Sequence, residues 1–199
     1  MSGLWIIGAG GHAKVAIAAA EGAGEFVAGV VDSNPALAGQ RLLGHSILGA
    51  HDWSAHDRAH LAIGDNKIRA RLAAEMPVEW VNVEHPLAWR HPSVQVGEGT
   101  LVCAAAILQP DARVGRHVII NTSSIVEHDC VVGDFSFLGP RACLTGNVRL
   151  GTGCFIGAGA TICPGITLGD HVTVGAGAVV NKDVPSGVTV VGVPAKKIR

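Results

Sequence analysis

Aliphatic residues recur at every sixth position through the second half of the chain. Eight of them are followed directly by glycine, and the residue two positions before each is small or β-branched. An α-helix does not repeat every six residues, and a flat sheet would need turn signals between its strands. The fifteen residues of this series are Val96, Val102, Leu108, Val114, Ile120, Val126, Val132, Leu138, Leu144, Leu150, Ile156, Ile162, Leu168, Val174 and Val180.

Six residues suit one side of a triangular coil, in which a short strand is followed by a tight turn that glycine relaxes. Three sides make a coil of 18 residues, so residues 94–183 predict five coils of a parallel β-helix. The aliphatic series then stacks along the inside as the core of this half of the chain. We assign residues 94–199 to this β-helix and its C-terminal tail.

The first half of the chain follows a different pattern, in which short apolar strands alternate with helical stretches. Strands are expected at 4–7, 26–31, 59–64 and 78–83, and helices at 12–23 and 66–75. Near-continuous apolar strands separated by helices indicate a small parallel sheet with helices on its faces, a Rossmann-like α/β domain. We place this domain at 1–84 and a linker at 85–93, where two His-Pro dipeptides interrupt regular structure.

Composition narrows the classes of function. The net charge is −1 and aromatic residues make up 4% of the chain, with no Tyr, which argues against a nucleic-acid-binding protein. No apolar run reaches the length of a membrane span. The five cysteines form no CxxC pair and the first residues lack a basic segment, so we expect reduced thiols, no signal peptide and a cytoplasmic location.

The repeat is interrupted at His128 and Asp129, in the segment IVEHDC (125–130). A histidine at this turn could be a general base, because imidazole titrates near ~6.5 and can accept the proton of an attacking amine. Asp129 or Glu127 could then hold the ring tautomer. One coil further lies Gly146, whose N–H could stabilise an oxyanion near the imidazole. A solvated turn histidine is an equally good interpretation of the sequence alone, and Cys130 is better explained as a small packing residue than as a nucleophile.

The loop GAGGHA (8–13) follows a strand and precedes a helix, with Asp32 closing the next strand. Taken alone it fits a dinucleotide-binding fingerprint, with phosphate at the helix N-terminus. About 80 residues give only half of a full Rossmann sheet, which argues against NAD, and a tight turn without ligand remains the alternative. His51, His56 and His60 have a possible metal-binding spacing, but they lead straight into a strand, so we expect a loop and no metal site.

The repeat resembles the left-handed β-helix of the hexapeptide acyltransferases, and the ending VVGVPAKKI (190–198) resembles the C-terminal signature of their acetyl-CoA-dependent members. With NTSSIVEHDC, TGNV and GAGGHAK, the whole chain is similar to bacterial sugar O- and N-acetyltransferases, including those that acetylate the 4-amino group of nucleotide-linked sugars. The resemblance implies a homotrimer with sites between subunits. It also implies acetyl-CoA as co-substrate and direct attack without an acyl-enzyme.

The resemblance further implies roles for individual residues. His128 would be the base, with Asp129 and Gly146 beside it in the catalytic centre. The nucleotide-linked amino sugar would contact Gly10, Gly11, His12, Asp32, Asn66 and Asn121, and acetyl-CoA would contact Gly146, Ala158, Gly175, Ala176 and Lys196.

One position departs from the family pattern. Many relatives have F-S-H nine residues after the base, whereas this chain has Phe137 there. Phenylalanine cannot donate a hydrogen bond, so polarisation of the thioester would rest on backbone N–H groups. We therefore expect a sugar 4-N-acetyltransferase. The alternatives are O-acetylation of a sialic-acid-type sugar and a nucleotide-binding β-helix protein without activity.

Overall fold

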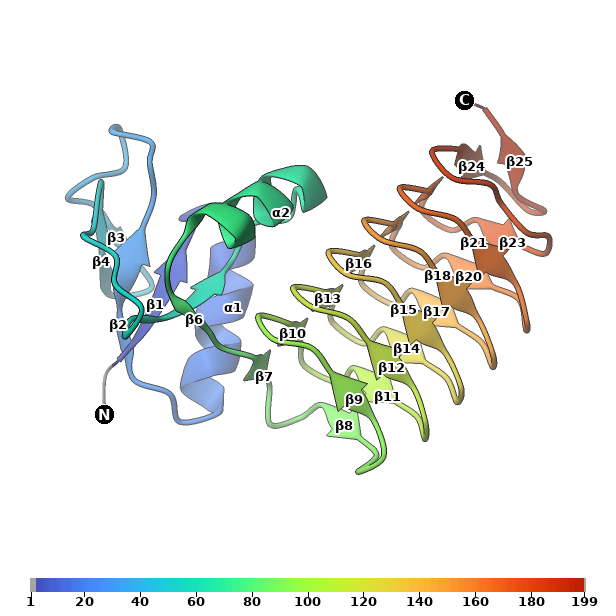
Figure 1. Ribbon diagram of the computed structural model, residues 1–199, viewed down its shortest axis with the longest axis horizontal. Helices are drawn as coiled ribbons and strands as arrows, with labels where there is room; N and C mark the ends of the chain where they lie inside the picture. The colour runs from blue at the N-terminus through green and yellow to red at the C-terminus, as the bar shows by residue number, and fades with distance from the viewer. Residues whose placement is uncertain (1–2, 199) are drawn as a thin grey trace.

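The computed structural model describes residues 3–198, which form an N-terminal α/β unit and a long β-helix (Figure 1). The N-terminal sheet has the strand order β3-β4-β2-β1-β5-β6, with helices α1 (Gly11–Gly22) and α2 (Asn66–Glu75) between its strands. The strands are β1 (Leu4–Ile7), β2 (Val27–Val31), β3 (Arg41–Leu42), β4 (His45–Leu48), β5 (Arg58–Leu61) and β6 (Glu79–Trp80).

The expected parallel sheet with helices is confirmed, with two differences. The sequence missed the β3–β4 hairpin, in which Leu43 and Gly44 both have positive φ and β4 pairs in parallel with β2. The expected strand at 78–83 is divided between two sheets. Its first part forms β6 beside β5, and its end contributes Val83 to the first strand of the β-helix.

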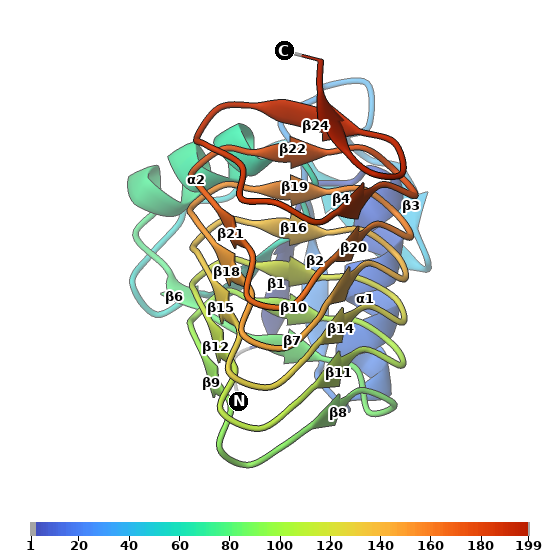
Figure 2. The same cartoon turned by 90° about the vertical axis from the view of Figure 1, so that its right-hand side faces the viewer.

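The β-helix has three faces, each a sheet of short parallel strands stacked along the axis (Figure 2). Face I comprises β7 (Val83–Glu84), β10 (Leu101–Val102), β13 (Ile119–Ile120), β16 (Phe137–Leu138), β19 (Phe155–Ile156), β22 (Thr173–Val174), β24 (Thr189–Val191) and the antiparallel β25 (Lys196–Lys197). Face II comprises β8 (Trp89–Arg90), β11 (Ile107–Leu108), β14 (Ile125–Val126), β17 (Cys143–Leu144), β20 (Thr161–Ile162) and β23 (Val179–Val180). Face III comprises β9 (Gln95–Val96), β12 (Arg113–Val114), β15 (Val131–Val132), β18 (Arg149–Leu150) and β21 (Thr167–Leu168).

The predicted register is confirmed: Val102 pairs with Ile120 and Leu108 with Val126, each 18 residues apart. The aliphatic series forms one buried core, to which Val96 is a partly buried addition.

The β-helix begins earlier than the sequence predicts. Strands β7 and β8 belong to faces I and II, so residues 85–93 contain strand β8 and parts of the turns on either side of it, and the proposed linker is wrong. Pro92 lies 18 residues before Pro110, at the same turn position of the next coil. A proline at this position fits the coil, because the turns between strands do not need its N–H for pairing.

The glycines that follow the aliphatic residues permit close packing between coils. A Cβ at Gly133 would lie 2.5 Å from the carbonyl carbon of Gly151 in the next coil. Positive φ falls two residues after the glycine position, at residues such as His117 (51°) and Asp129 (61°). The glycines that directly follow the core residues therefore provide the absence of a side chain. The expectation that glycine relaxes the turn holds at another position of the coil, where Gly99, Gly153, Gly159, Gly165 and Gly177 have positive φ.

The N-terminal domain packs on face I and on the corner between faces III and I. Leu101 and Ile119, which point outward from face I, share a core with Ala16 and Ile17 of α1. On the other side of the domain, α2 lies beside the corner (Figure 2). The domain therefore covers the lower coils of face I and leaves the corner between faces II and III open.

A buried arginine joins α2 to that corner. Arg69 has no exposed surface, and its guanidinium donates to the carbonyl oxygens of His117 (2.8 Å), Phe135 (2.7 Å) and Ile63 (2.8 Å). Burial lowers the pKa of Arg69 to about 10, so it stays charged at neutral pH. Burial, together with the charge of Arg69, lowers the pKa of the neighbouring His12 and His117 to about 4.

His60 should make the fold sensitive to acid. Its side chain is 1% exposed, and burial lowers its pKa from 6.5 to about 4. The unfolded chain binds this proton more readily, so the free energy of unfolding should fall as pH drops from 6.5 to about 4, by up to about 3 kcal/mol from this residue. His60→Asn keeps a donor for the Val81 carbonyl oxygen, 3.0 Å from Nδ1. We expect a flatter pH profile in this variant.

Urea unfolding between about pH 7 and pH 4.5 would measure this effect. His56→Asn, which replaces an exposed histidine, is the control and should keep the wild-type profile. Parallel profiles for wild type and His60→Asn would rule out the buried imidazole as a source of acid sensitivity.

Candidate active site

His128 and Asp129 lie together at the corner between faces II and III. Nδ1 of His128 is 2.8 Å from Oδ2 of Asp129, and both side chains are about half exposed, at 56% and 52%. Asp129 has the positive φ that this turn position requires, which aspartate tolerates better than most residues. A carboxylate that accepts from Nδ1–H leaves the Nε2 lone pair directed away from it. The pair can therefore act as an oriented base.

Gly146 lies one coil further along, directly against the imidazole. A Cβ at Gly146 would sit 2.7 Å from both Cε1 and Nε2 of His128, so the ring occupies the space that a side chain would fill. Cys130 points the other way: it is fully buried, Sγ lies 3.1 Å from the Thr145 carbonyl oxygen, and burial raises the pKa of its thiol to about 11. A buried thiol of this kind is a poor nucleophile.

The glycine loop is held by Asp32 from the adjacent strand. Oδ2 of Asp32 accepts from the Ala9 N–H at 2.7 Å, and Oδ1 accepts from the Asn34 N–H at 2.8 Å. Gly10 is the N-cap of α1 and Gly11 its first residue, and a Cβ at either would meet nothing within 4 Å. The backbone at the start of α1 is therefore uncrowded at Gly10 and Gly11, and a helix N-terminus of this kind can bind an anion.

His12 and Phe137 line the junction between the glycine loop and face I. Their ring centroids are 6.2 Å apart, and Phe137 stacks on Phe155 of the next coil at 5.0 Å with planes 9° apart. Within residues 3–198, Nε2 of His12 is buried without a hydrogen-bond partner. Because its pKa is lowered to about 4, His12 is neutral at pH 7 and suits a hydrogen bond to a ligand better than a charge contact.

Apart from Gly146, the residues expected to bind acetyl-CoA follow the corner between faces I and II. Ala158 and Ala176 occupy equivalent positions in successive coils, with Asn121 lower on the same corner. Asn121 is 8% exposed, and its Oδ1 accepts from the Thr122 N–H. Above Gly175 lies Val191, which pairs with Lys196 across the β24–β25 turn. This corner is therefore continuous from Asn121 to the C-terminal hairpin.

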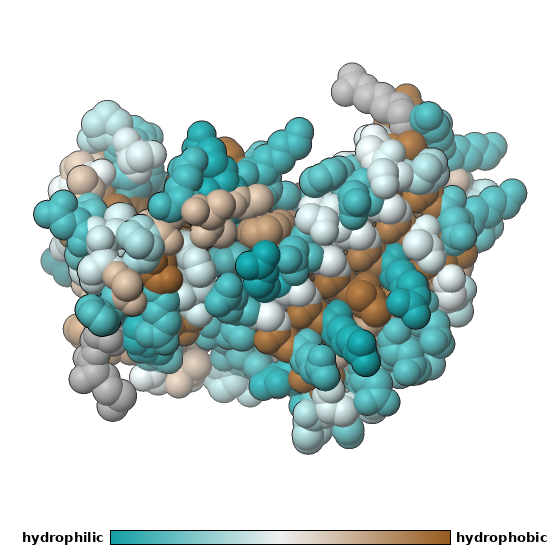
Figure 3. Space-filling model, viewed as in Figure 1, coloured by the Kyte–Doolittle hydropathy of each residue, from teal (hydrophilic) through white to brown (hydrophobic). Residues whose placement is uncertain are grey.

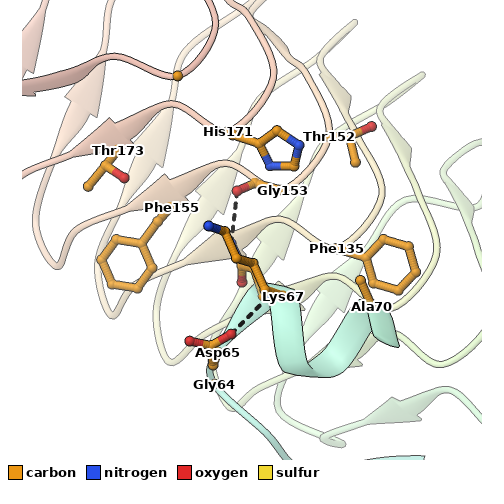
Figure 4. Close-up of a pocket in the computed structure, with 12 residues that line it drawn as sticks. Gly64, Asp65, Lys67, Ala70, Phe135, Thr152, Gly153, Phe155, His171 and Thr173 are labelled. Atoms are coloured by element: carbon orange, nitrogen blue, oxygen red, sulfur yellow. Dashed lines mark hydrogen bonds between the residues drawn. The ribbon is translucent and has the colours of Figure 1, made fainter. Parts of the chain in front are cut away.

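Asn66 makes contacts between the domains. Its Nδ2 donates to the carbonyl oxygens of Gly153 and Cys154, both at 3.0 Å, and its Oδ1 accepts from Arg69 at 2.8 Å. Both amide hydrogens are thereby used, which leaves one lone pair for any ligand. Asn66 lines a groove of about 940 Å³ between α2 and the corner of faces III and I (Figure 4).

Lys67, Phe155 and His171 also line this groove, and the sequence analysis missed them. The 18-residue register alone would have aligned His171 with Gly153, but no motif connects either residue to α2.

The predicted residues do not gather at one place in a single chain. The glycine loop, His12 and Asn121 lie around face I, where the N-terminal domain packs. His128, Asp129 and Gly146 lie at the corner of faces II and III, which is the edge of the triangular coil opposite face I (Figure 2). The structure therefore does not bring His128 and the glycine loop of the same chain together.

Two family descriptions match the chain. Residues 3–76 match the PglD N-terminal domain, and residues 129–163 and 147–182 match the bacterial transferase hexapeptide of six repeats.

Solved structures resemble the whole chain. PerB from Caulobacter crescentus, in complex with CoA and GDP-perosamine, is 40% identical with a TM-score of 0.92, covering 100% of this chain and 98% of that one. The acetyltransferase domain of PglB from Neisseria gonorrhoeae, in complex with acetyl coenzyme A, is 36% identical with a TM-score of 0.90 and covers 98% of each chain. The chain belongs to the hexapeptide-repeat sugar acetyltransferases.

WeeI from Acinetobacter baumannii is 28% identical with a TM-score of 0.88 and covers 100% of both chains. A curated relative, the uncharacterized protein L142 of Acanthamoeba polyphaga mimivirus, is 34% identical over 103 residues. The match spans 21% of the length of that relative. Within residues 3–198, no helix is long and apolar enough to cross a membrane, and no cluster of three potential metal ligands occurs.

Gly146→Ala tests the contact between Gly146 and His128. The added methyl group would lie 2.7 Å from the imidazole of His128, so the ring must move from its hydrogen bond with Asp129. We expect kcat for acetyl transfer to fall about tenfold or more with thermal stability nearly unchanged, because the corner is exposed and misplacement of a catalytic group is costly. Thiol release from acetyl-CoA would measure the rate. Gly22→Ala, at the exposed end of α1, where an added Cβ would meet nothing closer than 3.4 Å, is the control for a glycine-to-alanine change away from this contact.

Proposed function

We propose that this protein transfers the acetyl group of acetyl-CoA to the 4-amino group of a nucleotide-linked deoxysugar, with His128 as general base. The observation that carries the proposal is the His128–Asp129 pair, oriented by a 2.8 Å hydrogen bond and packed against the bare backbone of Gly146. The relatives solved with CoA and GDP-perosamine or with acetyl coenzyme A support the donor and the class of acceptor.

The proposed reaction is a direct attack. The sugar amine, losing a proton to Nε2 of His128, forms a bond to the thioester carbonyl carbon, and collapse of the tetrahedral intermediate expels the CoA thiolate. The carboxylate of Asp129 stabilises the imidazolium that forms. A backbone N–H near Gly146 is the proposed donor to the oxyanion. Burial of the Cys130 thiol, with its pKa raised to about 11, argues against an acyl-cysteine intermediate.

The glycine loop supports a phosphate-bearing acceptor. Gly10 and Gly11 leave the N-terminus of α1 open, and Asp32 lies beside it at the carboxyl end of β2. Ligands of open parallel sheets bind at such carboxyl ends. We assign the sugar nucleotide to this loop, with the neutral His12 directed at its sugar end, and we expect the enzyme in the cytoplasm, where sugar nucleotides and acetyl-CoA meet.

A homotrimer would complete the site. Because His128 stands opposite face I in its own chain, it can reach a sugar held at the glycine loop only in a neighbouring copy. Face II has the apolar surface that such packing needs: Ile107, Ile125 and Val179 point outward and are partly exposed, and Trp89 is 49% exposed. Figure 3, which views the β-helix from the side of face III, shows hydrophobic residues between the charged side chains of that neighbouring face. Threefold closure would cover these surfaces.

Thiol release from acetyl-CoA tests the function. The acceptors would be GDP- and UDP-linked 4-amino-6-deoxysugars, the corresponding 4-hydroxy sugar nucleotides, and a sialic-acid-type sugar. Turnover with an amino sugar and none with its hydroxyl counterpart is expected. Turnover only with hydroxyl acceptors would replace the proposal by O-acetylation, and sedimentation of the purified protein would test the trimer.

A further inference from the structure

The groove between α2 and the corner of faces III and I contains a set of side chains with no assigned role. It measures about 940 Å³ and is lined by Lys67 from α2 and by Phe155, Thr173 and His171 from the β-helix. Of the residues assigned above to the substrates, only Asn66 reaches it, and the amide of Asn66 is mostly used in joining the domains. A groove of this size accommodates a nucleotide.

Lys67 brings an available positive charge into the groove. Figure 4 shows its side chain running from α2 between Phe155 and Gly153. Asp65 is close in sequence, but its Oδ1 caps α2 by accepting from the N–H groups of Lys67 and Ile68, both at 2.9 Å. Within residues 3–198, Lys67 forms no ion pair. Its ammonium group can therefore bind an anion without breaking an existing contact.

His171 faces the same space from the opposite wall (Figure 4). It has the positive φ of its turn (55°), and its ring lies over Gly153, where a Cβ would sit 2.5 Å from Nδ1. The preceding Asp170 accepts from the Thr152 N–H at 2.7 Å, which directs its carboxylate to the backbone. His171 is thus held at the rim with ring nitrogens able to donate to a ligand.

Phe155 supplies an aromatic surface on the same side of the groove as the end of Lys67 (Figure 4). It is 40% exposed on one side and stacked on Phe137 on the other, at 5.0 Å with planes 9° apart. Such a supported ring is suited to stacking with a heterocyclic base.

We propose that this groove binds a phosphorylated nucleotide, with Lys67 and His171 holding a phosphate group and Phe155 contacting the base or the adjoining sugar. The inference rests on the proposed function, because both substrates, acetyl-CoA and the sugar nucleotide, carry phosphate groups next to a base. The shared chemistry is phosphate bound by an ammonium group and an imidazole N–H on opposite walls. Affinities for CoA and for free nucleotides distinguish which substrate supplies the phosphate.

Isothermal titration calorimetry with CoA, 3′-dephospho-CoA, GDP and UDP tests the proposal. Lys67→Met is expected to weaken binding of at least one of these ligands about tenfold, as expected when one charge-assisted hydrogen bond is lost, and His171→Gln to weaken the same ligand less. Arg71→Met is the matched control, since Arg71 lies on the same helix, is 65% exposed and pairs with Glu75. It should bind as wild type does.

A loss of affinity confined to GDP or UDP assigns the groove to the acceptor substrate. A loss of affinity confined to CoA assigns it to the acetyl donor, and comparison with 3′-dephospho-CoA shows whether the 3′-phosphate is the group that binds. Unchanged affinities for all four ligands in both Lys67→Met and His171→Gln would overturn the proposal. Thiol release separates it from the proposed function. If the wild type releases thiol and the variants bind all four ligands with unchanged affinity, only the groove site is disproved. If ligand binding depends on Lys67 but no acceptor supports thiol release, only the acetyltransferase assignment is disproved.

Discussion

Replacing His128 with alanine should lower kcat for acetyl transfer at least ~100-fold, the contribution typical of a positioned general base. The amine acceptor is mostly protonated near neutral pH, and the attack on the thioester requires a free lone pair and a group that takes the remaining proton. The imidazole of His128, oriented through Nδ1 by Asp129, is placed to take this proton at the corner of faces II and III. KM for acetyl-CoA should change little, because the imidazole acts on the acceptor.

The exposure of His128 makes this variant informative. Since 56% of its side chain is exposed, its removal leaves the core of the β-helix intact, and the melting temperature should stay near that of wild type. Asp129→Asn should lower kcat less, because the ring loses the carboxylate but keeps a hydrogen-bond partner. His56→Ala, an exposed histidine in the N-terminal domain, should leave kcat unchanged. Wild-type turnover by His128→Ala would remove the imidazole from the mechanism.

The β-helix could be predicted because every coil repeats the same environment. The core position is filled by an aliphatic residue fifteen times, so register errors cannot accumulate. Its beginning was harder to see, because the first coil has Glu84 and Arg90 where later coils have aliphatic residues. Pro92, in register with Pro110, was the remaining signal. The β3–β4 hairpin was missed because its strands are short and mostly exposed, with Leu43 in place of the glycine or asparagine typical of such a turn.

Contacts at the candidate site could be predicted where both residues belong to the repeat, because the 18-residue register fixes their neighbours. The proximity of Gly146 to His128 could be predicted because equivalent positions in successive coils stack. Contacts between α2 and the β-helix could not, because no period relates the two domains. Lys67 and Arg69 are two ordinary basic residues in the sequence, yet the fold directs one into an open groove and buries the other completely. Their different roles depend on which side of α2 faces the β-helix, and the sequence alone does not show where α2 packs.

Replacing Arg69 with methionine should destabilise the protein by about 3–5 kcal/mol, the usual range for breaking a buried charged network. The side chain has no exposed surface, and its donors satisfy the carbonyl oxygens of Ile63, His117 and Phe135 at 2.7–2.8 Å. Methionine fills part of the volume but leaves these acceptors buried without partners, and each such group costs about 1–3 kcal/mol. Relief from burying the charge offsets part of that loss.

Urea unfolding at pH 7 would measure the change, with Arg71→Met as the control that removes an exposed charge from the same helix. Arg69→Lys should recover only part of the loss, because an ammonium group cannot reach carbonyl oxygens from three segments in the plane of a guanidinium. A variant Arg69→Met within about 1 kcal/mol of wild type would mean that water or repacking satisfies these carbonyls. The junction between α2 and the β-helix would then rest on Asn66 and on apolar packing, and Arg69 would have no special part in joining the domains.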